Sequence, residues 1–314
     1  MGDWLKLRKP ATTVESVGLG LLCVAIIYAG WWFITRGQAE SRLVGPLTLP
    51  SPAETFGAFQ TLWTDFELTR NLLVTLRRVS LGFALAMAVG IPVGILAGCF
   101  PRLEAFLQPI IMFGRNIPLA AVLPLMIFIF GTGEPNKVMF IFVAAVAFII
   151  SDAARAITDV ASRYIDTAYT LGASRWQTIM KVLVPLAAPT IFSSCRQLFG
   201  LAFGYIMLAE SIKEADSAGG LGYQIQISQR RGIRENIYLI ILLIPLVALL
   251  IDQVLFWIQR QLFPHVYSGD GFLRDCVRGT LNLWEDCTSF LRRRRPEALP
   301  TAAPTDKPAG GLKL

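Results

Sequence analysis

Residues 79–100, VSLGFALAMAVGIPVGILAGCF, form a continuous apolar run without a charged side chain. About 20 such residues are enough to cross the hydrocarbon core of a membrane as a helix. The run does not alternate between apolar and polar residues, so it favours a helix over a barrel strand. Small residues recur at every fourth position and therefore share one helix face, where we expect a neighbouring backbone to approach closely: Gly82, Ala86, Gly90, Gly94 and Gly98.

Five further apolar segments accompany this run along the chain. Only 16% of the 314 residues are charged, against about 25% in soluble domains. The sequence therefore predicts an all-α, polytopic membrane protein with about six transmembrane helices. The other five segments cover approximately residues 17–34, 108–131, 135–150, 190–209 and 237–257.

The first segment, residues 17–34, allows two interpretations. It follows basic residues, as the apolar part of a signal peptide does. However, it has the length of a span, and its terminal aromatic residues Trp31, Trp32 and Phe33 are typical of a membrane interface. These features favour an uncleaved transmembrane helix.

Prolines interrupt the segment at residues 108–131, where Pro109, Pro118 and Pro124 occur. A proline frees backbone carbonyls, which membrane proteins tolerate when the helix is buried or lines a cavity. The segment is therefore either a kinked helix beside a pathway or an ordinary bundle helix. We take Pro118 and Pro124 as candidate pathway residues.

Charge distribution predicts the orientation in the membrane. Six spans place both termini on one side, and basic residues near both ends, including Arg292 to Arg295, mark that side as the cytoplasm. The rule is not followed throughout, because Arg230, Arg231 and Arg234 would then lie outside, as would Arg77 and Arg78 unless they sit on an interfacial helix. Basic flanks of spans also explain the net charge of +7, so we expect contact with a membrane and not with nucleic acid.

A polar, amphipathic passage at residues 166–189 lies between two apolar runs, and parity places it in the cytoplasm. Gly172 suits the left-handed cap of one helix, and Ser174 with Gln177 forms a capping box that opens a second. This helix pair either rests on its own protein or lipid, or docks into a partner's groove. One apolar stripe is expected on each helix: Val160, Tyr164, Ala168 and Leu171 on the first, and Trp176, Ile179, Met180 and Leu183 on the second.

This passage resembles the coupling motif of bacterial ABC importer permeases, which reads EAA, three residues, G, nine residues, I-x-L-P. The departures are Asp for Glu, Thr for Ala, and Val for both Ile and Leu, which broadly keep charge and shape. The adjoining "LGASRWQT" is typical of the family. The residues to which the resemblance gives a coupling role are Asp166, Thr167, Ala168, Gly172, Ala173, Ser174, Trp176, Val182 and Pro185.

Two other stretches extend the resemblance to the nitrate/sulfonate/taurine/bicarbonate branch of this family. They are "NIPLAAVLPLMIFIFGTGEPNK" at 116–137 and "AESIKEADSAGGLGY" at 209–223. The resemblance implies a type I ABC importer permease that passes a small oxyanion across a bacterial inner membrane. It further implies two cytoplasmic ATPase subunits, a periplasmic or lipoprotein solute-binding protein and a second permease subunit, expected to be identical.

The chemistry-bearing residues fit that division of labour. The chain has no Walker A motif, no nucleophile–base pair and no metal-ligand set in its sequence, so we expect neither catalysis nor a cofactor, with ATP and magnesium bound by the partner ATPase. An ion-coupled secondary transporter is the alternative, but it predicts internal repeats and acidic midplane residues. An intramembrane enzyme would need a His, Ser or metal constellation.

Ionisable residues within spans are costly and therefore informative. Arg196 and Asp252 could form a structural ion pair across two helices. Glu210, at the outer end of the fifth span, fits a gate better than a site for an anion. Gly220 and Gly222 permit turns closed to other residues, and the resemblance places them in a re-entrant piece near the pathway.

The sequence divides into four regions. Residues 1–16 are expected to be a cytoplasmic N-terminus, and residues 17–264 the permease domain, with a coupling segment at 160–189. Residues 265–295 have helical apolar spacing followed by four arginines, which predicts an interfacial basic helix, with a solvated tail as the alternative. Residues 296–314, rich in Pro and Ala, are expected to be disordered.

Overall fold

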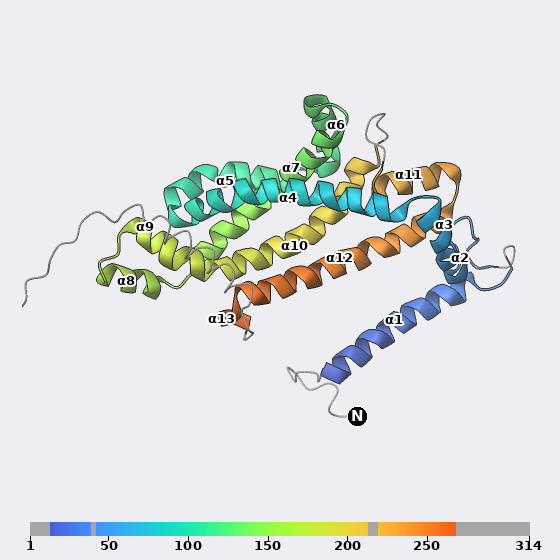
Figure 1. The fold of residues 1–314 in the computed structure, drawn as a ribbon, viewed down its shortest axis with the longest axis horizontal. Coiled ribbons are helices and arrows are strands. Elements are labelled where there is room, and N and C mark those ends of the chain that lie inside the picture. The colour runs from blue at the N-terminus through green and yellow to red at the C-terminus, as the bar shows by residue number, and fades with distance from the viewer. Residues whose placement is uncertain (1–12, 39–41, 213–218, 268–314) are drawn as a thin grey trace, which may run out of the picture. The chain divides into compact units, whose positions relative to one another are not determined.

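A computed structural model describes residues 13–38, 42–212 and 219–267, and all regular secondary structure in these ranges is helical (Figure 1). The all-α prediction is thus confirmed. Most of the predicted N-terminal region 1–16, the predicted basic helix at 265–295 from residue 268 on, and residues 296–314 lie outside the described residues. The helices are α1 (Thr13–Thr35), α2 (Pro52–Gly57), α3 (Phe59–Thr64), α4 (Leu68–Cys99), α5 (Pro101–Asn116), α6 (Leu119–Phe130), α7 (Glu134–Thr158), α8 (Ser162–Thr170), α9 (Arg175–Thr178), the π-helix η1 (Ile179–Leu183), α10 (Val184–Glu210), α11 (Leu221–Arg231), α12 (Arg234–Leu262) and α13 (Pro264–Tyr267).

The chain separates into two units after Gln259. The first unit holds every site discussed below. The second begins at Arg260 and contains, among the described residues, the last residues of α12 and the short helix α13.

Five helical segments are long and apolar enough to cross a membrane, and a sixth span results if the bent pair α5–α6 counts as one. This agrees with about six predicted spans, but the helices are longer than the apolar runs. The helix α4 begins at Leu68 instead of residue 79, and α7 continues to Thr158. Polar residues such as Asn71 and Thr75 extend α4 because their side chains find partners inside the protein.

The small residues of α4 pack against α7, as their spacing predicted. A Cβ added at Gly94 would lie 2.6 Å from the backbone oxygen of Ile150, and one at Gly98 would lie 2.5 Å from that of Ala154. Larger side chains would therefore separate the two helices. Ala86 on the same stripe is fully buried, so this face forms the centre of the bundle.

The break predicted in the third span lies at Ile117 and Pro118. The helices α5 and α6 are bent by 102° at this point. Ile117 is extended (φ −67°, ψ 128°), as expected for a residue before proline. Pro124 and Pro109 lie inside helices and do not interrupt them, so only one of the three prolines accounts for the break.

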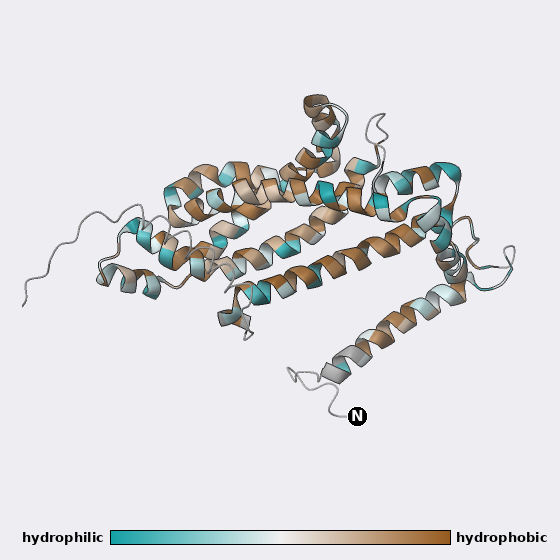
Figure 2. Cartoon of the chain, viewed as in Figure 1, coloured by the Kyte–Doolittle hydropathy of each residue, from teal (hydrophilic) through white to brown (hydrophobic). Residues whose placement is uncertain are grey.

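The segments α9, η1 and α10 follow one another without interruption from Arg175 to Glu210. Backbone hydrogen bonds in η1 join residues that are five positions apart; for example, the N–H of Val184 donates to the oxygen of Ile179. The helix α12 packs through Leu239 and Ile240, which are buried. Hydrophobic residues predominate along α12 (Figure 2). Several of them, such as Leu246, Leu249 and Leu250, are exposed, as expected for a helix in contact with lipid.

The connection between α1 and α4 is folded by polar contacts. Trp31 Nε1 donates to the backbone oxygen of Pro50 at 2.9 Å, and Ser51 forms a capping box with Glu54 at the start of α2. Arg42 donates to both carboxylate oxygens of Glu54, at 3.1 and 2.9 Å. These hydrogen bonds lower the pKa of the Glu54 carboxyl to about 2.

Candidate functional site

The predicted helix pair is formed by α8 and α9, at the opposite end of the first unit from α11 (Figure 1). The helix α8 ends in a Schellman motif. Gly172 has φ +78°, its N–H donates to the oxygen of Tyr169, and the N–H of Ala173 donates to that of Ala168, both at 2.9 Å. The left-handed cap predicted at Gly172 is therefore confirmed.

Ser174 opens α9 with the reciprocal capping box expected from the sequence. Its N–H donates to Oε1 of Gln177 at 2.8 Å, and its Oγ accepts from the N–H of Gln177 at 3.4 Å. Because α9 continues through η1 into α10, the second helix of the pair is the beginning of a long helix that enters the bundle.

The apolar residues of the helix pair face in two directions. Ala168, Ile179 and Leu183 are buried, whereas Leu171 is 82% exposed and Trp176 is 62% exposed. The single stripe predicted for the second helix is therefore wrong. Ile179 and Leu183 are part of the core because η1 continues directly into α10, which enters the bundle. The exposed side chains form what we call the coupling surface: Tyr164, Tyr169, Leu171, Trp176 and Met180.

The remaining motif residues occupy different environments. Asp166, Thr167 and Pro185 are exposed, and Val182 is half-buried. The hydroxyl of Thr167 donates to the backbone oxygen of Arg163 at 2.7 Å, which secures the first turn of α8. The structure thus brings the motif residues into one compact helix pair, and their coupling role stays a prediction.

At the other end, Glu210 lies in a buried network that we call the Arg78 node: Thr75, Arg78, Glu134, Glu210 and Gly219 to Gly222. Its carboxylate accepts from the Thr75 hydroxyl at 2.9 Å, from Arg78 Nη1 at 2.8 Å and from the N–H of Gly222 at 3.1 Å. Arg78 also donates to Glu134 through Nε at 3.0 and 3.1 Å. The Arg78 side chain is 1% exposed, and that of Glu210 is fully buried.

The glycine-rich turn completes this node. Gly220 has φ +108°, and its N–H donates to Oδ1 of Asn71 at 2.7 Å. A Cβ at Gly220 would overlap the Glu210 carboxylate. The N–H of Leu221 donates to Thr75 Oγ1 at 2.9 Å. Three candidate pathway residues, Glu210, Gly220 and Gly222, therefore meet, but in a fully hydrogen-bonded site that ties α11 to α4 and α10.

Arg78 was missed by sequence reasoning, which treated it as a topology signal. A signal was present: residues 71, 75 and 78 are spaced by four and three and continue the small-residue stripe that begins at Gly82. Asn71 and Thr75 thus mark a polar extension of the buried face.

The candidate ion pair of Arg196 and Asp252 is close but weakly formed. Arg196 Nε lies 3.4 Å from Asp252 Oδ1, and this nitrogen has no hydrogen-bond partner in the described chain. The Arg196 guanidinium also lies 4.8 Å from the ring centroid of Phe256. The Asp252 side chain is 39% exposed, so the pair differs sharply from the Arg78 node.

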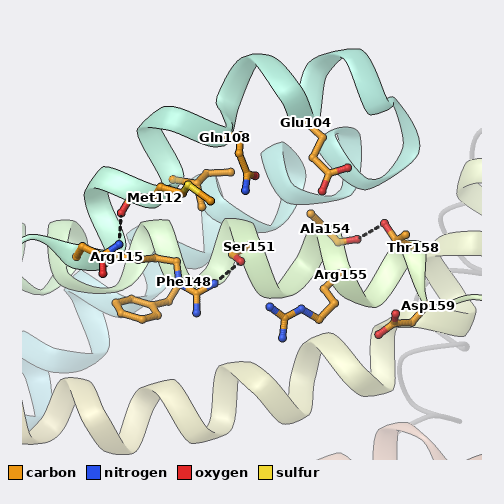
Figure 3. Close-up of a pocket in the computed structure, with 12 residues that line it drawn as sticks. Glu104, Gln108, Met112, Arg115, Phe148, Ser151, Ala154, Arg155, Thr158 and Asp159 are labelled. Carbon is orange, nitrogen blue, oxygen red and sulfur yellow. Dashed lines mark hydrogen bonds between the residues drawn. The ribbon is translucent and has the colours of Figure 1, made fainter.

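A polar groove between α5 and α7 contains a second arginine that the sequence reasoning did not single out. The groove has a volume of about 680 Å³ and is lined by Arg115, Ser151 and Arg155 among others (Figure 3). Pro118 lies just beyond the end of α5, and neither it nor Pro124 lines the groove. Residues of α5 thus line a groove, whereas the role of the broken span, and of Pro118 and Pro124, in a pathway stays a prediction.

Comparison with known proteins gives consistent matches. The family described as "Binding-protein-dependent transport system inner membrane component" matches residues 90–267. The taurine transport system permease protein TauC of Escherichia coli is 32% identical, over 83% of this chain and 93% of that protein. The bicarbonate transport system permease protein CmpB of Synechococcus elongatus is 31% identical, over 75% and 86%.

A solved structure shares the fold. An inward-facing crystal form of the MetNI methionine ABC transporter contains a chain with a TM-score of 0.55 and 23% sequence identity. The match covers 62% of this chain and 94% of that chain.

Proposed function

The chain belongs to the family of binding-protein-dependent transport system inner membrane components and is the permease subunit of an ABC importer; from this premise we propose that it imports a small oxyanion. The solutes in the names of the two relatives, taurine and bicarbonate, both carry a singly charged oxyanion group. In the proposed cycle, an external binding protein delivers the solute, and ATPase partners supply the energy.

The coupling surface is the observation that carries the proposed coupling to an ATPase. Large apolar side chains, Leu171 and Trp176 above all, are exposed on a capped helix pair at one end of a long helix. A short amphipathic element of this kind fits a groove on a partner. The ATPase, with its ATP and magnesium, is that partner in the proposed assembly, which contains two copies of this chain.

The proposed location is the bacterial inner membrane, with both termini and the coupling surface in the cytoplasm. Arg77 and Arg78, which contradict the positive-inside rule in the sequence, form ion pairs with Glu134, and Arg78 also with Glu210. Paired arginines add little net positive charge to the outer side. Their pairing gives these two arginines a structural role, whereas Arg230, Arg231 and Arg234 remain exceptions to the positive-inside rule in this orientation.

The experiment that tests coupling replaces Gly172 by proline. Proline fixes φ near −65° and lacks an N–H, whereas Gly172 has φ +78° and donates to Tyr169. We expect Gly172→Pro to reach the membrane at the wild-type level, to retain less ATPase on purification and to lose ATP-driven uptake at least tenfold.

Two exposed leucines give a milder, matched comparison. Leu171→Ser, in the coupling surface, should weaken retention of the ATPase, whereas Leu43→Ser should not; the two side chains are 82% and 76% exposed. Wild-type uptake by Gly172→Pro would contradict the coupling role. Uptake by the purified chain without an ATPase would support a secondary transporter instead.

A further inference from the structure

The groove between α5 and α7 carries polar side chains from both helices, interspersed with apolar ones such as Ile111 and Met112. On α5, Gln108 and Arg115 are seven residues apart and share a face; on α7, Phe148, Ser151 and Arg155 do the same with spacings of three and four. All five line the groove (Figure 3). Polar faces of this kind within helices of a membrane protein usually border a water-filled cavity or a pathway.

Arg115 is held firmly but is not neutralised. Its Nη1 donates to Ser151 Oγ at 2.6 Å, and its guanidinium carbon lies 5.2 Å from the ring centroid of Phe148. These contacts fix the plane of the guanidinium. Among the described residues no carboxylate forms an ion pair with Arg115, so several of its five N–H donors have no acceptor in this part of the chain.

A fixed cation without a counter-ion is costly within a membrane-spanning segment. Arg78, in the same bundle, has two carboxylates. The contrast indicates that the counter-ion of Arg115 comes from outside the described part of the chain, and a bound anion would supply it. A planar guanidinium presents paired donors that match two oxygens of a sulfonate, carbonate or nitrate group.

The acidic residues of the groove lie at its other end. Glu104 precedes Arg115 on α5, at a helical rise of about 16 Å, and Asp159 follows α7 directly. Figure 3 shows both near that end, with Arg155 between them and Ser151. The groove is therefore most positive around Arg115, and an anion that passes Arg155 next meets carboxylates, which disfavour its retention.

We propose that this groove is a transient binding site for the oxyanion group of the transported solute, with Arg115 as the principal ligand and Ser151 as the residue that positions it. The site rests on the proposed function, because it lies on the route of an imported anion. Asp159 lies next to α8 in sequence, so the acidic end of the groove faces the side of the coupling helices, where release into the cytoplasm would occur.

The test uses the complete importer, with its ATPase and binding protein, reconstituted in proteoliposomes. The probes are taurine and bicarbonate, and the readouts are initial uptake rate, apparent KM and ATP hydrolysis. Arg115→Gln should lower uptake at least tenfold while assembly and binding-protein-stimulated ATP hydrolysis stay within twofold of wild type. Arg102→Gln is the matched control, because Arg102 is an exposed arginine on the same helix and does not line the groove.

Two milder variants separate binding from folding. Arg115→Lys keeps the charge but loses the paired N–H donors of the guanidinium. Ser151→Ala removes the acceptor that orients the Arg115 side chain. Each variant should raise KM several-fold at an unchanged melting temperature. If Arg115→Gln lowers the melting temperature, the KM values of these two variants decide whether Arg115 binds the solute. Unchanged KM in both, or loss of the second permease copy on purification of Arg115→Lys, would overturn the site.

The experiment distinguishes a failure of the proposed binding site from a failure of the proposed function. A wild-type importer that transports taurine or bicarbonate, together with an equally active Arg115→Gln variant, removes only the site. A wild-type importer that hydrolyses ATP but transports neither these probes nor nitrate nor an aliphatic sulfonate contradicts the oxyanion function, and the site is then lost with it.

Discussion

Two arginines in the membrane-spanning helices, Arg78 and Arg115, differ in burial and in the number of their hydrogen-bond partners. Arg78 is buried and donates to Glu134, Glu210 and the backbone oxygen of Gly219. Arg115 is half-buried and donates to one serine hydroxyl. The comparison teaches that the hydrogen-bond and ion-pair partners of an intramembrane charge must be known before a function is inferred from it. A fully paired charge stabilises the fold, whereas an unpaired one leaves donors for a ligand.

The position of each arginine agrees with this distinction. The Arg78 node joins α4, α7, α10 and the start of α11, and its longest contact spans 146 positions of the chain. The Arg115 groove is bordered by only two helices and is partly open. Variants of the node should therefore affect stability first, and variants of the groove should affect uptake first.

The largest effect is expected from Arg78→Met. This change leaves Glu210 buried without its cation, and breaking a buried pair in this way costs about 3–5 kcal/mol. The free energy of unfolding or the melting temperature in detergent should fall accordingly, together with the yield of folded protein.

Two further variants sharpen this result. Arg77→Gln should change stability little, because Arg77 is 61% exposed and shares Glu134 with Arg78. The double variant Arg78→Met/Glu210→Gln should recover part of the loss, since the second change removes the orphaned charge. A stable Arg78→Met protein would show that the node is not a structural site.

A smaller effect is expected at the glycine turn. Gly220→Ala introduces a Cβ that overlaps the Glu210 carboxylate at φ +108°, and strain and overlap together should cost about 3 kcal/mol. Gly232→Ala is the matched control, because Gly232 has φ +74° with open space around its Cα. That change should cost about 1 kcal/mol. Equal melting temperatures for the two variants would contradict the tight contact.

The smallest effect is expected at the pair of Arg196 and Asp252. Since Asp252 is 39% exposed and the contact lacks a hydrogen bond, Asp252→Asn should lower stability by less than about 1 kcal/mol. Exchange of the two residues should restore what is lost. A decrease as large as that of Arg78→Met would show that this pair is a second buried node.

Local features of the fold were predictable from the sequence. The stripe of small residues, the left-handed Gly172, the capping box at Ser174 and the break before Pro118 all depend on neighbours within a few positions. Their geometry follows from helix periodicity and backbone sterics. The helix ends were less predictable, because Asn71 and Thr75 extend α4 by means of partners that include Glu210 and the distant glycine turn.

Long-range pairing accounts for what the sequence did not reveal. Arg78 meets Glu210 across 132 positions of the chain, and no periodicity in α4 identifies that partner. Arg115 likewise depends on Ser151, 36 positions away on another helix. Ile179 and Trp176 share apolar character, and only the path of α10 decides that the first is buried and the second exposed.

The unbroken run from Arg175 to Glu210 has a mechanical consequence. Its 36 residues correspond to a rod about 54 Å long, with Trp176 at one end and the glycine turn hydrogen-bonded to the other. A lever of that length converts a tilt of about 5° into a displacement of about 5 Å at its far end. A small rotation at the coupling surface would thereby be enlarged at the far end of the run, beside the Arg78 node.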